Sequence, residues 1–162
     1  MKKLLTFALA LVMVLSLSAT AFASDITQDS DPKTADTNVN FSVDPTYTVT
    51  IPATVTLAKA ADGSYKQDAT ITAENVRLLE NKVIKVTLAS DFKLTTGVNG
   101  ASYELPYTVT VGDDTNAITT GASVATFGTS TTEQSSILHF AAANPTYAGD
   151  YKDTVTFTIA VE

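Results

Sequence analysis

The sequence predicts an all-β protein, folded as a single antiparallel Ig-like β-sandwich of about seven to nine strands. Apolar and polar residues alternate in most segments after residue 38, which is the period of a strand with one buried face. Turn signals rich in Gly, Asp and Asn separate these segments at nearly regular spacing. Threonine is the commonest residue, and β-branched residues favour strands. A small closed β-barrel is the alternative that these patterns leave open.

The N-terminal segment has the three parts of a bacterial export signal. Lys2 and Lys3 supply a positive start, residues 4–17 are almost continuously apolar, and residues 21–23 give the small-x-small pattern of a cleavage site. We therefore expect residues 1–23 to be a cleaved signal peptide. The apolar stretch is shorter than the about 20 residues that span a bilayer. We expect a secreted, extracellular protein, released or associated with the cell surface, with no membrane insertion after signal cleavage.

Residues 24–38 are expected to form a mobile acidic tail. They contain four aspartates and one sizeable apolar side chain, Ile26, so ordering them would bury too little surface. The formal net charge of −7 becomes −9 once Lys2 and Lys3 leave with the signal. Nucleic acid is therefore not an expected partner.

The sandwich domain is expected to cover residues 39–162, and its first strand to begin at Phe41. The apolar residues of that strand share one parity; they are Phe41, Val43, Tyr47, Val49 and Ile51. Pro45 and Pro52 punctuate the run, and a proline belongs at a strand start, an edge or a switch between sheets. Val55 and Leu57 continue the parity, which predicts that the chain bends at Pro52 and then resumes pairing.

Further segments alternate clearly enough to predict strands. They are residues 69–73, 82–89, 103–111, 124–127 and 137–140, and a final strand through Val155, Phe157, Ile159 and Val161. Residues 82–89 are expected to be a central strand, with Ile84, Val86 and Leu88 on one face.

The segments between these strands have the composition of turns. Residues 61–64, 97–100 and 112–116 are predicted turns, and residues 128–136 a surface loop. Residues 74–81 have the one mildly helical pattern of the chain. They are too few for a stable helix, so we expect a loop or a single turn there.

Little in the sequence supports catalysis or a cofactor. Cysteine is absent, and the single histidine, His139, is predicted to point outward from its strand between Leu138 and Phe140. No Gly-x-Ser-x-Gly nucleophile motif occurs. The aspartate pairs at 29/31 and 113/114 lack the spacing of a calcium loop and are interpreted as solvated surface. We therefore expect a protein that is not an enzyme and binds no cofactor or metal.

The closing stretch, residues 147–159 (YAGDYKDTVTFTI), carries a family resemblance. It is similar to the final strand of secreted bacterial β-sandwiches of the Gram-positive type, including pilin-like, spore-coat-U-like and WxL surface domains. Phe157-Thr-Ile159 stands where a second Trp-x-Leu motif would lie in a WxL domain. The segment from Tyr47 to Ala53 also resembles the opening of secreted proteins from Gram-positive gut bacteria. The resemblance implies an extracellular or cell-surface role.

Two non-catalytic functions follow. The first is a structural or adhesive surface protein that associates with itself through sheet edges, so that a homo-oligomer is expected. Val39, Phe41 and Val43 are the candidate strand-addition segment, although the favoured interpretation makes them the first strand of the domain's own sheet.

The alternative is a glycan- or peptide-binding module, with a protein or a cell-surface glycan as partner. Tyr65 and Tyr147, predicted in loops, are its candidate contacts. The remaining tyrosines fall on the apolar parity of their strands and are expected in the core or at corners; they are Tyr47, Tyr103, Tyr107 and Tyr151.

Overall fold

The computed structural model describes residues 25–98 and 100–162. The chain divides into two units, one ending at Phe41 and one covering Ser42–Glu162. Residues 25–41 contain no helix or strand, only a turn in which the Ser30 amide donates to the Thr27 carbonyl at 3.2 Å. The predicted signal peptide lies outside the described residues, and the division into leader, tail and domain stays a prediction. Among the described residues no helix could cross a membrane.

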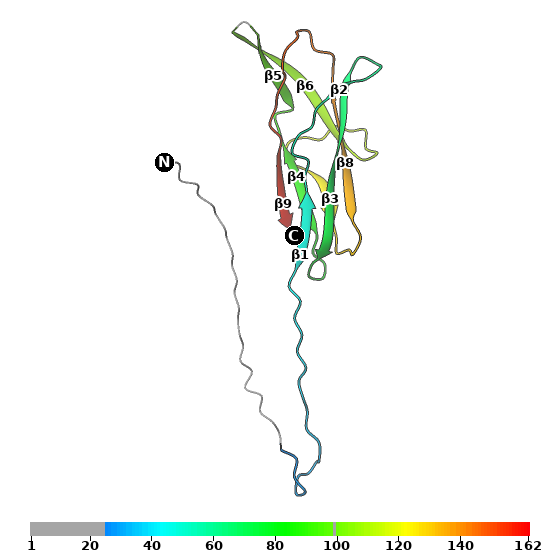
Figure 1. The fold of residues 1–162 in the computed structure, drawn as a ribbon, viewed down its shortest axis with the longest axis vertical. Coiled ribbons are helices and arrows are strands. Elements are labelled where there is room, and N and C mark those ends of the chain that lie inside the picture. Colours follow the sequence, from blue (N-terminus) through cyan, green and yellow to red (C-terminus); the bar gives the residue numbers. More distant parts are fainter. Residues whose placement is uncertain (1–24, 99) are drawn as a thin grey trace, which may run out of the picture. The chain divides into compact units, whose positions relative to one another are not determined.

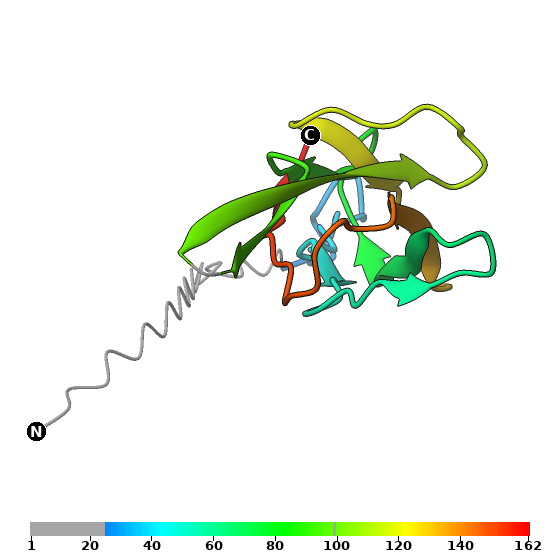
Figure 2. The same ribbon diagram turned by 90° about the horizontal axis from the view of Figure 1, so that it is seen from above.

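The second unit is a β-sandwich, as the sequence predicts (Figure 1). Its described residues form nine strands in two antiparallel sheets, and Figure 2 shows their arrangement from above. The strands are β1 (Thr46–Thr50), β2 (Ala58–Lys59), β3 (Tyr65–Arg77), β4 (Ile84–Ala89), β5 (Lys93–Val98), β6 (Ala101–Val111), β7 (Ala122–Phe127), β8 (Gln134–Ala142) and β9 (Thr156–Val161).

The larger sheet has the order β1-β3-β8-β6-β5, with β2 also paired to β3. The smaller sheet has the order β7-β4-β9, so the predicted central position of β4 is confirmed. Between the sheets, the Ser136 hydroxyl donates to the Val124 carbonyl at 2.7 Å. The β5–β6 hairpin is closed at the predicted turn, where Gly100 takes a φ of +80° that favours glycine.

The core is built from the inner faces that the alternation predicted. Ile84, Val86 and Leu88 of β4 are fully buried, and Leu138 and Phe140 of β8 are buried while His139 points outward. Complete burial of one such side chain contributes about 1.5–3 kcal/mol. The buried apolar residues are Ala69, Ile71, Ala73, Val76, Ile84, Val86, Leu88, Tyr107, Val109, Val124, Ala125, Phe127, Leu138, Phe140 and Ala142.

The expectation of a loop or single turn at residues 74–81 is wrong for the first half of this segment, because β3 continues to Arg77. A β-bulge lies there: the β1–β3 register shifts between Thr46 and Thr48, and Asn75 takes a left-handed φ of 53°. The extra residue changes the inward parity of β3 from odd at Ala73 to even at Val76, which is buried. A strand whose parity changes midway has no constant two-residue period, and this gave the segment its mildly helical pattern.

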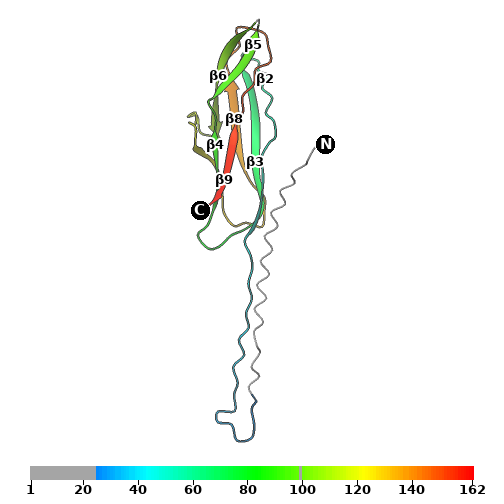
Figure 3. The same cartoon turned by 90° about the vertical axis from the view of Figure 1, so that its left-hand side faces the viewer.

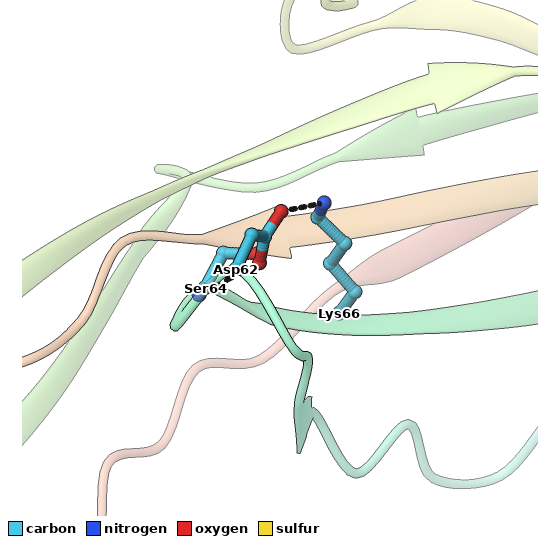
Figure 4. A network of polar contacts seen from close by, with 3 residues as sticks. All are labelled: Asp62, Ser64 and Lys66. Atoms are coloured by element: carbon cyan, nitrogen blue, oxygen red, sulfur yellow. Dashed lines mark hydrogen bonds and ion pairs between the residues drawn. The ribbon is translucent and has the colours of Figure 1, made fainter.

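A polar contact closes the β2–β3 hairpin at the predicted turn (Figure 4). The Asp62 carboxylate accepts a bond from the Lys66 ammonium at 2.7 Å and others from the Ser64 hydroxyl and amide. These donors, Lys66 first, hold the pKa of the Asp62 carboxyl well below its ordinary value of 3.8.

Truncating Leu138 to alanine is expected to lower the free energy of unfolding by about 2–5 kcal/mol, because the side chain is fully buried. The same change at Leu79, which is 64% exposed, serves as the control and is expected to cost less than about 0.5 kcal/mol. Urea unfolding measures both. Equal losses would contradict the placement of β8.

Lys66→Met is expected to raise the pKa of the Asp62 carboxyl toward 3.8, because the ammonium is the main cause of its lowering. The stabilisation from this contact is complete above pH 3.8 and is lost as the pH falls toward the lowered pKa. An NMR titration of the carboxyl carbon gives the value, with Lys33→Met in the N-terminal segment as control. An unchanged Asp62 titration in Lys66→Met would exclude the contact.

Candidate functional site

The sandwich has an open seam between β1 and β9. In the described part of the chain, β9 pairs with β4 alone and β1 with β3 alone, so each has one edge without a ladder partner. Figure 1 shows that the two strands run in opposite directions, and Figure 3 shows β9 beside β4. An edge of this kind can accept a further strand.

The inner face of β9 is uncovered although it faces the core. Ile159 lies opposite Val86 and Val161 opposite Ile84 in the β4–β9 ladder, so these pairs point to the same side of the sheet. The β4 residues are 0% exposed, whereas Ile159 is 39% and Val161 45% exposed. These β9 side chains face the core but remain exposed to solvent, because no strand among residues 25–98 and 100–162 lies next to β9 on the edge away from β4.

The backbone of β9 is also available on that side. Glu162 exchanges both backbone hydrogen bonds with Val83, at 2.9 and 3.1 Å. Backbone direction alternates along a strand, so the even-numbered residues of β9 bond toward β4. The odd-numbered residues Phe157, Ile159 and Val161 therefore direct their N–H and C=O groups to the open seam.

The opposite wall, formed by β1, is uncovered as well. Val49 lies opposite the buried Ala73, which places the odd-numbered residues of β1 on the inner face. Val49 is half-buried and Tyr47 is 44% exposed. Tyr47 is therefore not a core residue, because β1 has no ladder partner on that side among the described residues.

Two hollows continue the seam beyond the strands. The smaller has a volume of about 290 Å³ and the larger about 790 Å³, and both are lined by Val55, Leu57, Leu94 and Asp153. Tyr107, Phe140 and Val155 complete the smaller hollow. We call the seam together with these hollows the β1–β9 groove. Its residues come from the second unit alone, and its lining is mainly apolar.

A polar cluster lies at the base of the smaller hollow. The Tyr107 hydroxyl donates to the Asp153 carboxylate at 2.7 Å, and the Ser90 hydroxyl also donates to it at 2.7 Å. The Phe92 amide donates to Ser90 at 2.8 Å, while the Phe92 ring meets Tyr107 edge-on with 5.7 Å between centroids. Burial, with Asp153 adding to it, raises the pKa of Tyr107 well above its ordinary value, so the phenol stays a donor.

Further contacts hold the chain before β9 in place. Lys152 exchanges two backbone hydrogen bonds with Thr95 of β5, at 2.8 and 2.9 Å. Gly149 packs so closely on Thr96 that an added Cβ would lie 2.6 Å from the Thr96 hydroxyl. Residues 149–153 therefore form a fixed wall of the groove rather than a loose connection.

The predicted strand-addition segment lies outside the strands of the sandwich. The first strand begins at Thr46, directly after Pro45, so the favoured interpretation of Val39, Phe41 and Val43 as the domain's first strand is wrong. Val39 and Phe41 are each 90% exposed. Pro45 has no N–H to donate to a ladder, which agrees with a strand that starts only at Thr46.

The predicted contact tyrosines differ from each other. Tyr65 is not in a loop: it is the first residue of β3, half-buried against the core at the rim of the larger hollow. Tyr147 does lie in a loop, with an exposed ring 4.3 Å from the ring of Tyr103. Both tyrosines stay predicted contacts. His139 bonds to Asp68 across β3 and β8 at 2.6 Å, on the outer face and away from the groove.

Asp153 is the groove residue that the sequence did not indicate. It stands in a short polar run before the last strand, Lys152-Asp153-Thr154, which looks like an ordinary turn. Its partners Tyr107 and Ser90 lie 46 and 63 residues away in the chain. No local pattern could connect them.

No family model and no curated protein matches this chain. Similarity is found to a chain in the crystal structure of the CsuC–CsuE chaperone–tip adhesion subunit pre-assembly complex from archaic chaperone–usher Csu pili of Acinetobacter baumannii. The identity is 17% and the TM-score 0.49, over 73% of this chain and 40% of that one. A chain of the chaperone–tip adhesin complex of CFA/I fimbriae biogenesis matches at 15% identity and a TM-score of 0.45, over 70% of this chain and 41% of that one.

The chain thus spans about two fifths of the length of each of these two chains. Both structures belong to pilus or fimbrial systems, and neither is a Gram-positive surface protein of the kind that the sequence resembles. None of the comparisons indicates an enzymatic family.

Tyr107→Phe is expected to lower the free energy of unfolding by about 1–3 kcal/mol, because Asp153 loses a donor at the base of the groove. Tyr47→Phe removes the same hydroxyl from an exposed ring and is expected to change stability by less than about 0.5 kcal/mol. Thermal or urea unfolding distinguishes the two. A neutral Tyr107→Phe would show that the cluster does not fix the wall of the groove.

Proposed function

We propose that this chain is a non-catalytic structural protein of the cell exterior whose copies join by strand addition. Residues 39–43 of one copy occupy the β1–β9 groove of the next. One observation carries the proposal: the inward faces of β1 and β9 are uncovered, and an exposed segment with alternating apolar residues precedes the same domain. The predicted export signal accounts for the extracellular location.

The segment has the chemistry that the groove lacks. Val39, Phe41 and Val43 have one parity, so in an extended conformation all three side chains point to one face. Their burial contributes on the order of 5–9 kcal/mol in total. Association itself costs about 4–15 kcal/mol, so the backbone hydrogen bonds offered by β9 also have to contribute.

The segment is badly placed to fill the groove of its own chain. Only Asp44 and Pro45 separate Val43 from Thr46, the first residue of β1. Folding back along β1 requires a two-residue hairpin turn with Asp44 and Pro45 at its centre. Both favoured turn types need positive φ at the first central residue, whereas the residue before a proline is restricted to extended conformations with negative φ. Type I′ needs positive φ at the second residue as well, where proline fixes φ near −65°. Running parallel to β1 requires a crossover of about a dozen residues. The available groove is therefore that of another copy.

Assembly through this contact is open-ended. The donor segment and the acceptor groove are different surfaces, so each copy that donates its segment still offers an empty groove. Such head-to-tail contacts produce filaments rather than closed dimers, unless the rotation between copies closes a ring. The partner proposed here is thus a second copy of the same chain.

Phe41→Ala is expected to shift assembly of the chain from Ser24 to Glu162 to concentrations about 10- to 100-fold higher. The change removes the largest apolar side chain of the segment, about 1.5–3 kcal/mol of burial, without touching the folded core. Light scattering coupled to size exclusion gives the concentration dependence, and electron microscopy shows the form of the large species.

Ile26→Ala is the matched control, since Ile26 is an exposed apolar residue of the N-terminal unit outside the segment. It is expected to assemble like the parent chain. Deletion of residues 24–43 is expected to leave a folded monomer. A parent chain that stays monomeric at high concentration would overturn the proposal and direct attention to glycan and peptide arrays, with Tyr147 as the first residue to replace.

A further inference from the structure

We infer the register of the inserted strand: residues 35–43 of one copy run antiparallel to residues 153–161 of the next, with Phe41 opposite Val155. In this register the residue numbers of opposite partners always sum to 196. The inference rests on the proposed function and adds to it which side chain enters which part of the groove.

The direction follows from the free edge of β9. A strand between β1 and β9 is antiparallel to one of them and parallel to the other, because the two run in opposite directions (Figure 1). The odd-numbered residues of β9 point their backbone groups into the seam, and Lys152 continues the same alternation by bonding to Thr95. Antiparallel pairing is the slightly more stable form, and it extends the antiparallel sheet β7-β4-β9.

The volume of the smaller hollow selects the position of Phe41. This hollow of about 290 Å³, bordered by Val155, Phe140 and Tyr107, has room for an aromatic ring. With Phe41 opposite Val155, Val39 meets Phe157 and Thr37 meets Ile159. A shift by two residues one way puts the smaller Val43 into the hollow and leaves part of it empty. A shift the other way puts the Phe41 ring against the Asp153 carboxylate, where the inferred register places the smaller Val43.

The charges on the outer face select the same register independently. With Phe41 opposite Val155, Asp44 lies opposite Lys152, an exposed cation on the wall of the groove. The shift that moves Phe41 to Asp153 places Asp44 opposite Asp150. The shift that moves Phe41 to Phe157 places Asp36 opposite Glu162. Like charges directly opposite each other destabilise a strand pair, and opposite charges stabilise it.

Introduced cysteines test the register without interference, because the chain has none of its own. Asn40→Cys with Thr156→Cys places the two residues opposite each other on the outer face, as a pair without mutual hydrogen bonds. Cα atoms of such a pair are about 4.5 Å apart, within the range of a disulfide. Mild oxidation is expected to give a ladder of covalent oligomers on a non-reducing gel, and reduction is expected to remove it.

Two further double-cysteine variants test the two alternative registers, each with one of the same cysteines. Asn38→Cys with Thr156→Cys matches the shift toward Asp153, and Asn40→Cys with Thr158→Cys matches the shift toward Phe157. A displacement of two residues moves the sulfurs apart by about 7 Å, beyond disulfide reach. Both variants are expected to give at least fivefold less ladder than the first pair. The single variants Asn40→Cys and Thr156→Cys are expected to stop at dimers.

The outcomes separate the register from the function. A ladder strongest in either shifted pair overturns the register but keeps strand addition. Assembly by light scattering with no ladder in any pair overturns the antiparallel arrangement. A parent chain that does not assemble overturns the proposed function itself.

Discussion

The structure depends on one constraint: an apolar sandwich must be covered on every side, and this one is open along β1 and β9. The buried residues of β4 make a complete face only because β7 and β9 flank them. β9 has no such neighbour on its outer side within the described residues, so side chains that face the core stay in contact with water. In the proposed assembly, the cost of exposing these apolar surfaces to water is the driving force for binding a further strand.

Polar interactions fix the shape of the groove in the chain on its own. Asp153 holds the segment before β9 to the Tyr107 and Ser90 hydroxyls, and Lys152 ties it to β5. A groove that is already formed requires less ordering when it is filled, which favours tighter association. The same carboxylate stands at one end of the apolar floor and makes that end unsuitable for an aromatic ring.

Alternation in the sequence predicted the sandwich and most inward faces, because Ile84, Leu138 and their neighbours keep a strict two-residue period. It failed where local pattern does not determine the partner. Asn75 introduces a bulge that only the pairing with β1 reveals, and Phe41 has the period of a strand but lies outside the sheets. The open seam could not be predicted for the same reason. Alternation shows which residues belong to an apolar face, but it does not show which strand lies beside that face.

The two-residue connection between Val43 and β1 has a mechanical consequence. In a polymer joined as proposed, each domain follows its inserted strand after only Asp44 and the rigid Pro45, so little bending or twisting is available at each junction. Tension applied along such a filament pulls the inserted strand parallel to its ladder and loads the backbone hydrogen bonds together in shear. The filament is then stiff and resists extension, properties that depend on the joint as much as on the domains.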